Sequence, residues 1–175
     1  MAVYRARQAA CKRDVDFSRR LTSNFDYQKK LQESAASSPH VRTAIDTAPE
    51  HRLLVFPYLT DNLLQFDNKT LSLAQKNSIP KRVLLSLADL HNNCILHTDV
   101  KPNNIMVNCE AGPSRDVVVK DVQVTDLEGS VVIRPGKDLK GCVSANEIWR
   151  SPEPWRTILR RHVSCFGGFP GLRSF

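Results

Sequence analysis

Apolar residues recur along this chain at spacings that predict both helices and strands. From Phe25 to about Ala36 they follow the helical repeat. The stretch at residues 37–40 (SSPH) ends this helix, because the residue before a proline is pushed out of the helical region. A second, short helix is predicted from Pro80 to the asparagine pair at residues 92–93, since proline is favoured in a first helical turn.

Short apolar runs predict several strands. These lie at residues 41–46, 51–58, 105–107, 117–119 and 122–124. The second run contains the continuous apolar stretch LLVF, which is typical of a strand covered on both faces. Asp61 is expected to cap a short helix over Asn62–Phe66. Helices and short strands are therefore expected within one chain.

The length of 175 residues is typical of one domain, and the net charge of +7 is unevenly distributed. Residues 1–30 carry +5, residues 31–149 carry −2 and residues 150–175 carry +4. A groove that binds a duplex needs its positive charge within the fold. Because the excess lies at the two ends, we predict no nucleic-acid partner.

The sequence has no run of the ~18 apolar residues that a membrane helix needs, so no membrane partner is predicted. Its first residues lack the apolar core of a secretory signal, and an intracellular location, cytoplasmic or nuclear, is expected. The five cysteines are widely spaced and form no CxxC pair. A disulfide framework and a structural zinc site are therefore not predicted.

The stretch with the most specific chemistry is residues 97–104 (HTDVKPNN), which is followed by an apolar strand. Asp99 is a carboxylate that can orient a hydroxyl group and accept its proton, and Lys101 supplies a positive charge two residues later. Asn104 offers an amide oxygen, a ligand type that magnesium accepts. His97 is expected to brace this loop through backbone carbonyl groups.

A second carboxylate, Asp126, follows the predicted strand at residues 122–124. The end of a strand is a rigid place for a metal ligand. Asp99, Lys101, Asn104 and Asp126 together supply a base, a charge neutraliser and two magnesium ligands. This set is typical of phosphoryl transfer.

The stretch from about Leu84 to Trp155 resembles the catalytic core of a eukaryotic-type Ser/Thr protein kinase, and the residues around its motifs are similar to those of fungal kinases. Residues 97–107 (HTDVKPNNIMV) resemble the catalytic loop. Residues 125–129 (TDLEG) resemble the Asp-Phe-Gly motif, and residues 149–153 (WRSPE) resemble the Ala-Pro-Glu motif. The resemblance implies ATP and Mg²⁺ as cofactors and Ser/Thr residues of a protein as substrate.

The stretch at residues 53–66 (LLVFPYLTDNLLQF) is similar to the strand and hinge that join the two lobes of a kinase. On this match Phe56 is the gatekeeper, and Pro57, Tyr58 and Leu59 form the hinge that faces adenine. The resemblance thus adds four residues to the nucleotide site, beside Lys101, Asn104 and Asp126, with the last two as the metal ligands.

The resemblance implies an α+β, protein-kinase-like fold that is partial, with remnant N-lobe strands and helix, a hinge and the first half of a helical C-lobe. Four segments are expected. They are a basic and potentially disordered stretch (1–24), a partial N-lobe with hinge (25–59), a partial C-lobe with catalytic loop and activation segment (60–155) and an irregular tail (156–175).

The chain departs from the kinase pattern in several places. Thr98 replaces the usual arginine, and Leu127-Glu128 replaces Phe-Gly. The first glycine is Gly112, so no glycine-rich loop stands ahead of the hinge, and only 22 residues follow Glu153. We therefore expect a chain truncated at both ends, with impaired activity. An inactive remnant that serves as an interaction module is the alternative. A small-molecule phosphotransferase is less favoured, because Lys101 and the Ser-Pro-Glu motif fit a protein kinase.

Overall fold

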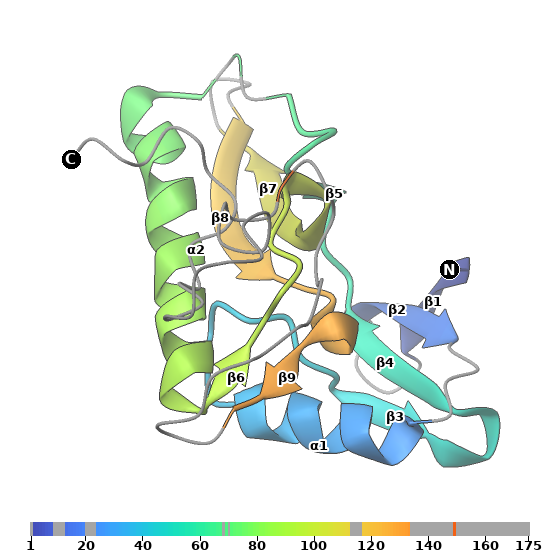
Figure 1. Ribbon diagram of the computed structural model, residues 1–175. Helices are drawn as coiled ribbons and strands as arrows, with labels where there is room; N and C mark the ends of the chain where they lie inside the picture. The colour runs from blue at the N-terminus through green and yellow to red at the C-terminus, as the bar shows by residue number, and fades with distance from the viewer. Residues whose placement is uncertain are drawn as a thin grey trace.

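The computed structural model of the chain describes residues 2–8, 13–19, 24–67, 69, 71–112, 117–133 and 149. These residues form two helices and nine strands, together with short 3₁₀ turns (Figure 1). The elements in chain order are β1 (Ala2–Gln8), β2 (Arg13–Arg19), α1 (Phe25–Ala35), β3 (Asp46–Ala48), β4 (Leu53–Pro57), β5 (Asp61–Asn62), α2 (Leu73–Asn92), β6 (Ile95–Leu96), β7 (Ile105–Ala111), β8 (Val117–Val124) and β9 (Val131–Val132).

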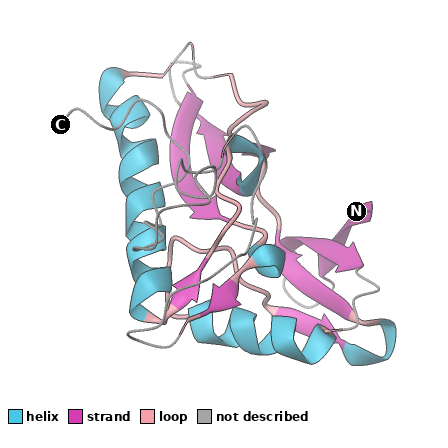
Figure 2. Ribbon diagram, viewed as in Figure 1, coloured by secondary structure: helices cyan, strands magenta, loops and turns pink. Residues whose placement is uncertain are grey.

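The strands form three antiparallel groups, which Figure 2 shows in magenta. The largest has the order β1-β2-β4-β3. Its first two strands lie within residues 1–24, where the sequence predicts no regular element. The local pattern explains the difference, because Val15 and Phe17 alternate with polar residues in a short and highly charged stretch. Phe17 of β2 pairs with Val55 of β4, so the N-terminal hairpin continues the sheet that leads to the predicted hinge.

The region between α1 and β4 also differs from expectation. Residues 41–46 do not form a strand; β3 begins only at Asp46, and a 3₁₀ turn at Pro49–His51 leads to β4. Val41 instead makes an isolated parallel bridge to Val124 at the end of β8. Pairing with a distant strand thus decides the backbone path of this stretch, and the local run of apolar residues does not.

Helix α1 ends close to where the sequence predicts, but α2 begins seven residues before Pro80. Its first turn is stabilised by a capping box, in which Ser72 and Gln75 exchange side-chain to backbone hydrogen bonds. Pro80 therefore lies inside the helix, where its ring removes one backbone hydrogen bond. The capping signal and the buried Ile79 outweigh the usual meaning of proline as a helix start.

A second sheet has the order β5-β7-β8. Asp61–Asn62 is strand β5, not the start of the helix expected over Asn62–Phe66, because both residues pair with β7. The two strands predicted at residues 117–119 and 122–124 are one strand, β8. Its register with β7 shifts between Asn108 and Cys109, which leaves Lys120 as an extra residue in a β-bulge.

The core lies between α1, α2 and the β7–β8 sheet. Figure 1 shows α2 running alongside β8, and α1 crossing near the β6–β9 pair. The most deeply buried apolar residues of the core come from the two helices, from β6, β7 and β8, and from the 3₁₀ turn after Asp126. They include Leu31, Val83, Leu90, Ile95, Ile105, Val107, Val122, Val124 and Leu127. The core thus fixes the ends of β6, β7 and β8, from which the candidate site is built.

Among the described residues, no helix is both long enough and apolar enough to cross a membrane.

Candidate active site

The candidate catalytic loop connects β6 to β7. It covers residues 97–104 and ends in a 3₁₀ turn at Pro102–Asn104. Its second residue, Thr98, has a left-handed φ of 66°. A β-branched residue rarely adopts this conformation. The Thr98 hydroxyl donates a 2.8 Å hydrogen bond to the Gly129 carbonyl, which holds the unusual backbone in place. This contact also ties the loop to the segment that follows Asp126.

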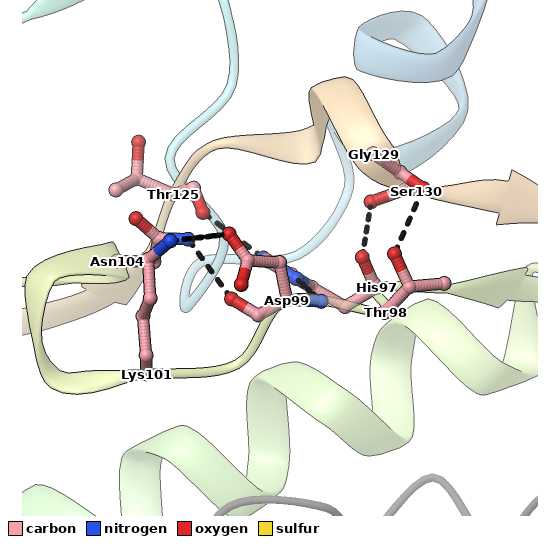
Figure 3. A network of polar contacts seen from close by, with 8 residues as sticks. All are labelled: His97, Thr98, Asp99, Lys101, Asn104, Thr125, Gly129 and Ser130. Carbon is pink, nitrogen blue, oxygen red and sulfur yellow. Dashed lines mark hydrogen bonds and ion pairs between the residues drawn. The ribbon is translucent and has the colours of Figure 1, made fainter. Parts of the chain in front are cut away.

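Asp99, Lys101 and Asn104, which the sequence predicts to act together, come together in this loop (Figure 3). The ammonium Nζ of Lys101 lies 2.6 Å from Asp99 Oδ2. The amide Nδ2 of Asn104 donates to the same oxygen at 3.0 Å and to the Asp99 backbone carbonyl at 2.9 Å. About three quarters of the Asp99 and Lys101 side chains is covered, since their exposed fractions are 24% and 23%. The carboxylate is therefore oriented by two donors and still reaches solvent.

The buried side chain of Asn104 has a defined orientation. Its amide nitrogen donates both of its hydrogen bonds to Asp99, so Oδ1 faces the other way. Within the part of the chain that the structure describes, Oδ1 accepts no hydrogen bond. An amide oxygen without a protein donor, close to a carboxylate, fits the oxygen ligands that magnesium prefers.

His97 joins the loop to the end of β8 from a position that is 1% exposed. Its Nε2 lies 2.9 Å from the Thr125 carbonyl, and its Nδ1 accepts a 3.3 Å hydrogen bond from the backbone N–H of Asp99. Because a carbonyl only accepts, Nε2 carries the proton and the ring is neutral. Burial lowers the pKa of His97, against the opposing influence of the Thr125 carbonyl and of the charges on Asp126 and Asp99. The predicted bracing role is confirmed.

Asp126 follows Thr125, the residue to which the candidate catalytic loop is hydrogen-bonded. The N–H of Thr125 donates to the Asn104 carbonyl at 2.9 Å, and the Thr125 carbonyl accepts from His97. The negative charges of Asp126 and Asp99 both favour a higher pKa of the His97 ring. Asp126 has a left-handed φ of 66°, which aspartate tolerates better than most residues.

The described residues offer few protein ligands for a metal ion at this site. Among the described residues, no group of three or more His, Cys, Asp or Glu could hold an ion. Asn104 and Asp126 remain the predicted pair, and phosphate oxygens of a nucleotide would complete the coordination. This composition fits magnesium, which keeps substrate phosphates and waters among its ligands.

Helix α1 contributes side chains that the sequence reasoning did not identify. Gln28, only 8% exposed, donates to the Glu128 carbonyl at 3.0 Å, and the Tyr27 hydroxyl donates to the Ser130 carbonyl at 3.2 Å. The Ser130 hydroxyl in turn donates to the His97 carbonyl at 3.2 Å. No local signal marks these residues, because their partners lie about a hundred positions away.

Other residues that the kinase pattern suggests are not part of the contacts described above. Glu33, the only glutamate of α1, is exposed and lies 4.0 Å from Lys29 on the same helix. Ser151, Pro152 and Glu153, which resemble the Ala-Pro-Glu motif, lie outside the described residues.

The predicted hinge leaves β4 beside the N-terminal sheet. Phe56, Pro57 and Tyr58 are half-buried, and Leu59 is buried at 6% exposure. The Pro57 carbonyl accepts hydrogen bonds from Nε and Nη2 of Arg42, at 2.8 and 2.5 Å. This oxygen is therefore engaged within the protein.

A family model of the protein kinase domain matches residues 11–160. The chain belongs to the protein kinase domain family. The kinase domain is also 28% identical, over 115 residues, to the phosphorylase b kinase gamma catalytic chain, liver/testis isoform, of Bos taurus. That match covers 63% of this chain and 26% of the bovine protein, so the kinase domain described here matches about a quarter of its relative's length. Family membership supports phosphoryl transfer in general and confirms the predicted partial kinase-like fold.

Proposed function

We propose that the chain transfers the γ-phosphate of ATP to a serine or threonine hydroxyl of a protein substrate, with the help of Mg²⁺. The observation that carries this proposal is the arrangement around Asp99. Its carboxylate contacts both Lys101 Nζ and Asn104 Nδ2, while the amide oxygen of Asn104 faces away from it. The residues proposed as base, cation and metal ligand thus lie within one short loop.

Asp99 would orient the substrate hydroxyl and accept its proton, because its partly exposed carboxylate can be reached from solvent. Lys101 is a donor on a flexible stem, and its ammonium would move from Asp99 to the γ-phosphate when the nucleotide binds. Most of the rate gain in such a site comes from positioning and electrostatic stabilisation.

Asn104 and Asp126 would hold magnesium, and Phe56, Pro57, Tyr58 and Leu59 would contact the adenine. Magnesium, when bound, neutralises the charge that develops on the phosphate oxygens. The backbone bond from Thr125 to Asn104 supports this pairing, because it connects the two segments that carry the proposed ligands.

Transfer of labelled phosphate from ATP to a protein substrate such as casein tests the proposal in the presence of magnesium. Asp99→Asn is expected to lower the rate by about 10²- to 10⁴-fold, the usual contribution of a positioned base. Asp26→Asn is the matched control, because Asp26 is an exposed residue in the first turn of α1. Equal rates for Asp99→Asn and the wild-type protein would contradict the proposal.

A non-catalytic interaction module is the second candidate. It is favoured by the absence of any glycine ahead of Gly112, which leaves this sequence without a glycine-rich phosphate loop before the hinge. A thermal shift with ATP and magnesium, but no phosphate transfer, would support this candidate.

Phosphorylation of choline or an aminoglycoside, and of no protein, would instead indicate a small-molecule phosphotransferase.

A further inference from the structure

Arg42 is a buried charged residue beside the predicted hinge, and none of the site motifs includes it. The side chain is 8% exposed, and two of its N–H groups donate to the Pro57 carbonyl. Its Cζ atom lies 5.4 Å from the centroid of the Phe56 ring, in the range of a cation–π contact. Burial of a guanidinium is costly unless it is hydrogen-bonded. The end of β4 provides such bonds.

The backbone of the same residue is bonded to the strand that leads to Asp126. The N–H of Arg42 donates to the Val124 carbonyl at 2.8 Å, and the N–H of Val124 donates to the His40 carbonyl at 2.9 Å. Val124 is the last residue of β8 and stands two positions before Asp126. Arg42 therefore connects the predicted adenine-binding segment to the segment with the predicted metal ligand.

We propose that Arg42 is a positioning residue for the nucleotide site, which keeps Phe56 and Pro57 at a fixed distance from Asp126. This inference rests on the proposed function. The base and the triphosphate of ATP are joined covalently, so both gain full contact only if their two subsites are correctly spaced. Loss of Arg42 is therefore expected to weaken binding of the complete nucleotide and not of the triphosphate alone.

The test compares two ligands on the full chain, MgATP and magnesium tripolyphosphate, which has no base. Arg42→Met removes both hydrogen bonds and keeps an unbranched apolar stem. It is expected to raise the Kd for MgATP about tenfold, as loss of a charged hydrogen bond predicts. The Kd for tripolyphosphate should stay within about twofold. Arg42→Lys keeps the charge and is expected to give an intermediate Kd for MgATP, which is a partial rescue.

Arg82→Met is the matched control. Arg82 Nη1 donates at 2.8 Å to the Lys120 carbonyl, so this variant also removes an arginine bond to a distant backbone oxygen, but on α2 and the β8 bulge. Both Kd values should remain as in the wild-type protein. If Arg42→Met does not fold, Arg42→Lys carries the comparison alone.

Three results would overturn the positioning role. The first is an equal loss of affinity for both ligands in a folded Arg42 variant, and the second is an unchanged MgATP affinity in such a variant. The third is the same loss in Arg82→Met. If the wild-type protein binds neither ligand, the proposed function fails and the role of Arg42 fails with it. If the wild-type protein binds MgATP and only the variant comparison fails, the proposed function stands.

Discussion

The predicted catalytic loop and the predicted hinge are held in place by different kinds of interaction. Hydrogen bonds to backbone carbonyls from His97, Thr98 and Ser130 join the loop at residues 97–104 to residues 125–130. Helix α1 supports that second segment through the bond from Gln28 to the Glu128 carbonyl. The hinge end of β4 is held by its strand pairing and by the Arg42 guanidinium, which bonds the Pro57 carbonyl. Side chains of several segments thus support the loop, whereas strand pairing and Arg42 hold the end of β4.

This difference separates the segment proposed to act on the phosphates from the segment proposed to bind the base, and substitutions in the two segments should have different effects. Changes in the loop segments should affect magnesium dependence and transfer. Changes at Arg42 should affect base binding. The three predictions below test the loop half, from the largest expected effect to the smallest.

Asp126→Asn should have the largest effect. Asparagine tolerates the left-handed backbone of this position, so the fold is expected to persist while the charged ligand is lost. The rate of phosphate transfer at a fixed low magnesium concentration should fall about 100-fold or more, since even the outer partners of a metal site contribute about 10- to 100-fold. Initial rates across a magnesium titration measure this. Adenosine binding, which depends on the hinge, should stay unchanged. A rate within about threefold of wild type at every magnesium concentration would rule out Asp126 as a ligand.

The second-largest expected effect is a pH dependence of the free energy of unfolding, which should depend on His97. Burial lowers the pKa of His97 below its ordinary value of 6.5, so below that pH the unfolded chain binds a proton that the folded chain resists. The stabilising contribution of the neutral imidazole is therefore fully present above about pH 6.5 and decreases as the pH falls below 6.5, by at most ~1.4 kcal/mol per pH unit for one proton.

Urea unfolding at several pH values measures this slope. His97→Gln should flatten it, and the remaining slope should include His91, whose pKa burial also lowers. His51→Gln is the control, because His51 is exposed. A slope of opposite sign, or one that His97→Gln leaves unchanged, would contradict the neutral buried imidazole.

Thr98→Val should have the smallest effect. Valine keeps the branched shape in the left-handed backbone but removes the hydrogen bond to the Gly129 carbonyl, so the free energy of unfolding should fall by about 1 kcal/mol. Thr98→Ser retains the hydroxyl and should remain within about 0.5 kcal/mol of wild type. Chemical denaturation of both variants gives the comparison. Equal stability of the Val and Ser variants would show that this bond does not support the loop.

Sequence patterns predicted the elements whose signals are local. The Ser-Ser-Pro stretch ended α1 close to Ala35, and the apolar run after Asn104 marked the start of β7. The hydrogen bonds among Asp99, Lys101 and Asn104 match the predicted grouping, because these residues lie within six positions of one another. The prediction failed at β5, whose bounds depend on pairing with the distant strand β7, and it also missed the bounds of β3, which pairs with the neighbouring strand β4.

The sequence by itself identified the four polar residues of the candidate site in this kinase domain, Asp99, Lys101, Asn104 and Asp126. It also identified the loop that carries the first three of them. Only the tertiary structure decided which distant groups support that loop and the hinge. Gln28 meets the Glu128 carbonyl across a separation of 100 residues, and Arg42 meets Pro57 after the chain has passed through β3 and a turn. Side-chain to backbone bonds of this kind depend on the path of the folded chain, and neither partner has a distinctive local pattern. The physical reason is that a backbone carbonyl is present at every residue, so the sequence does not reveal which one a buried donor will reach.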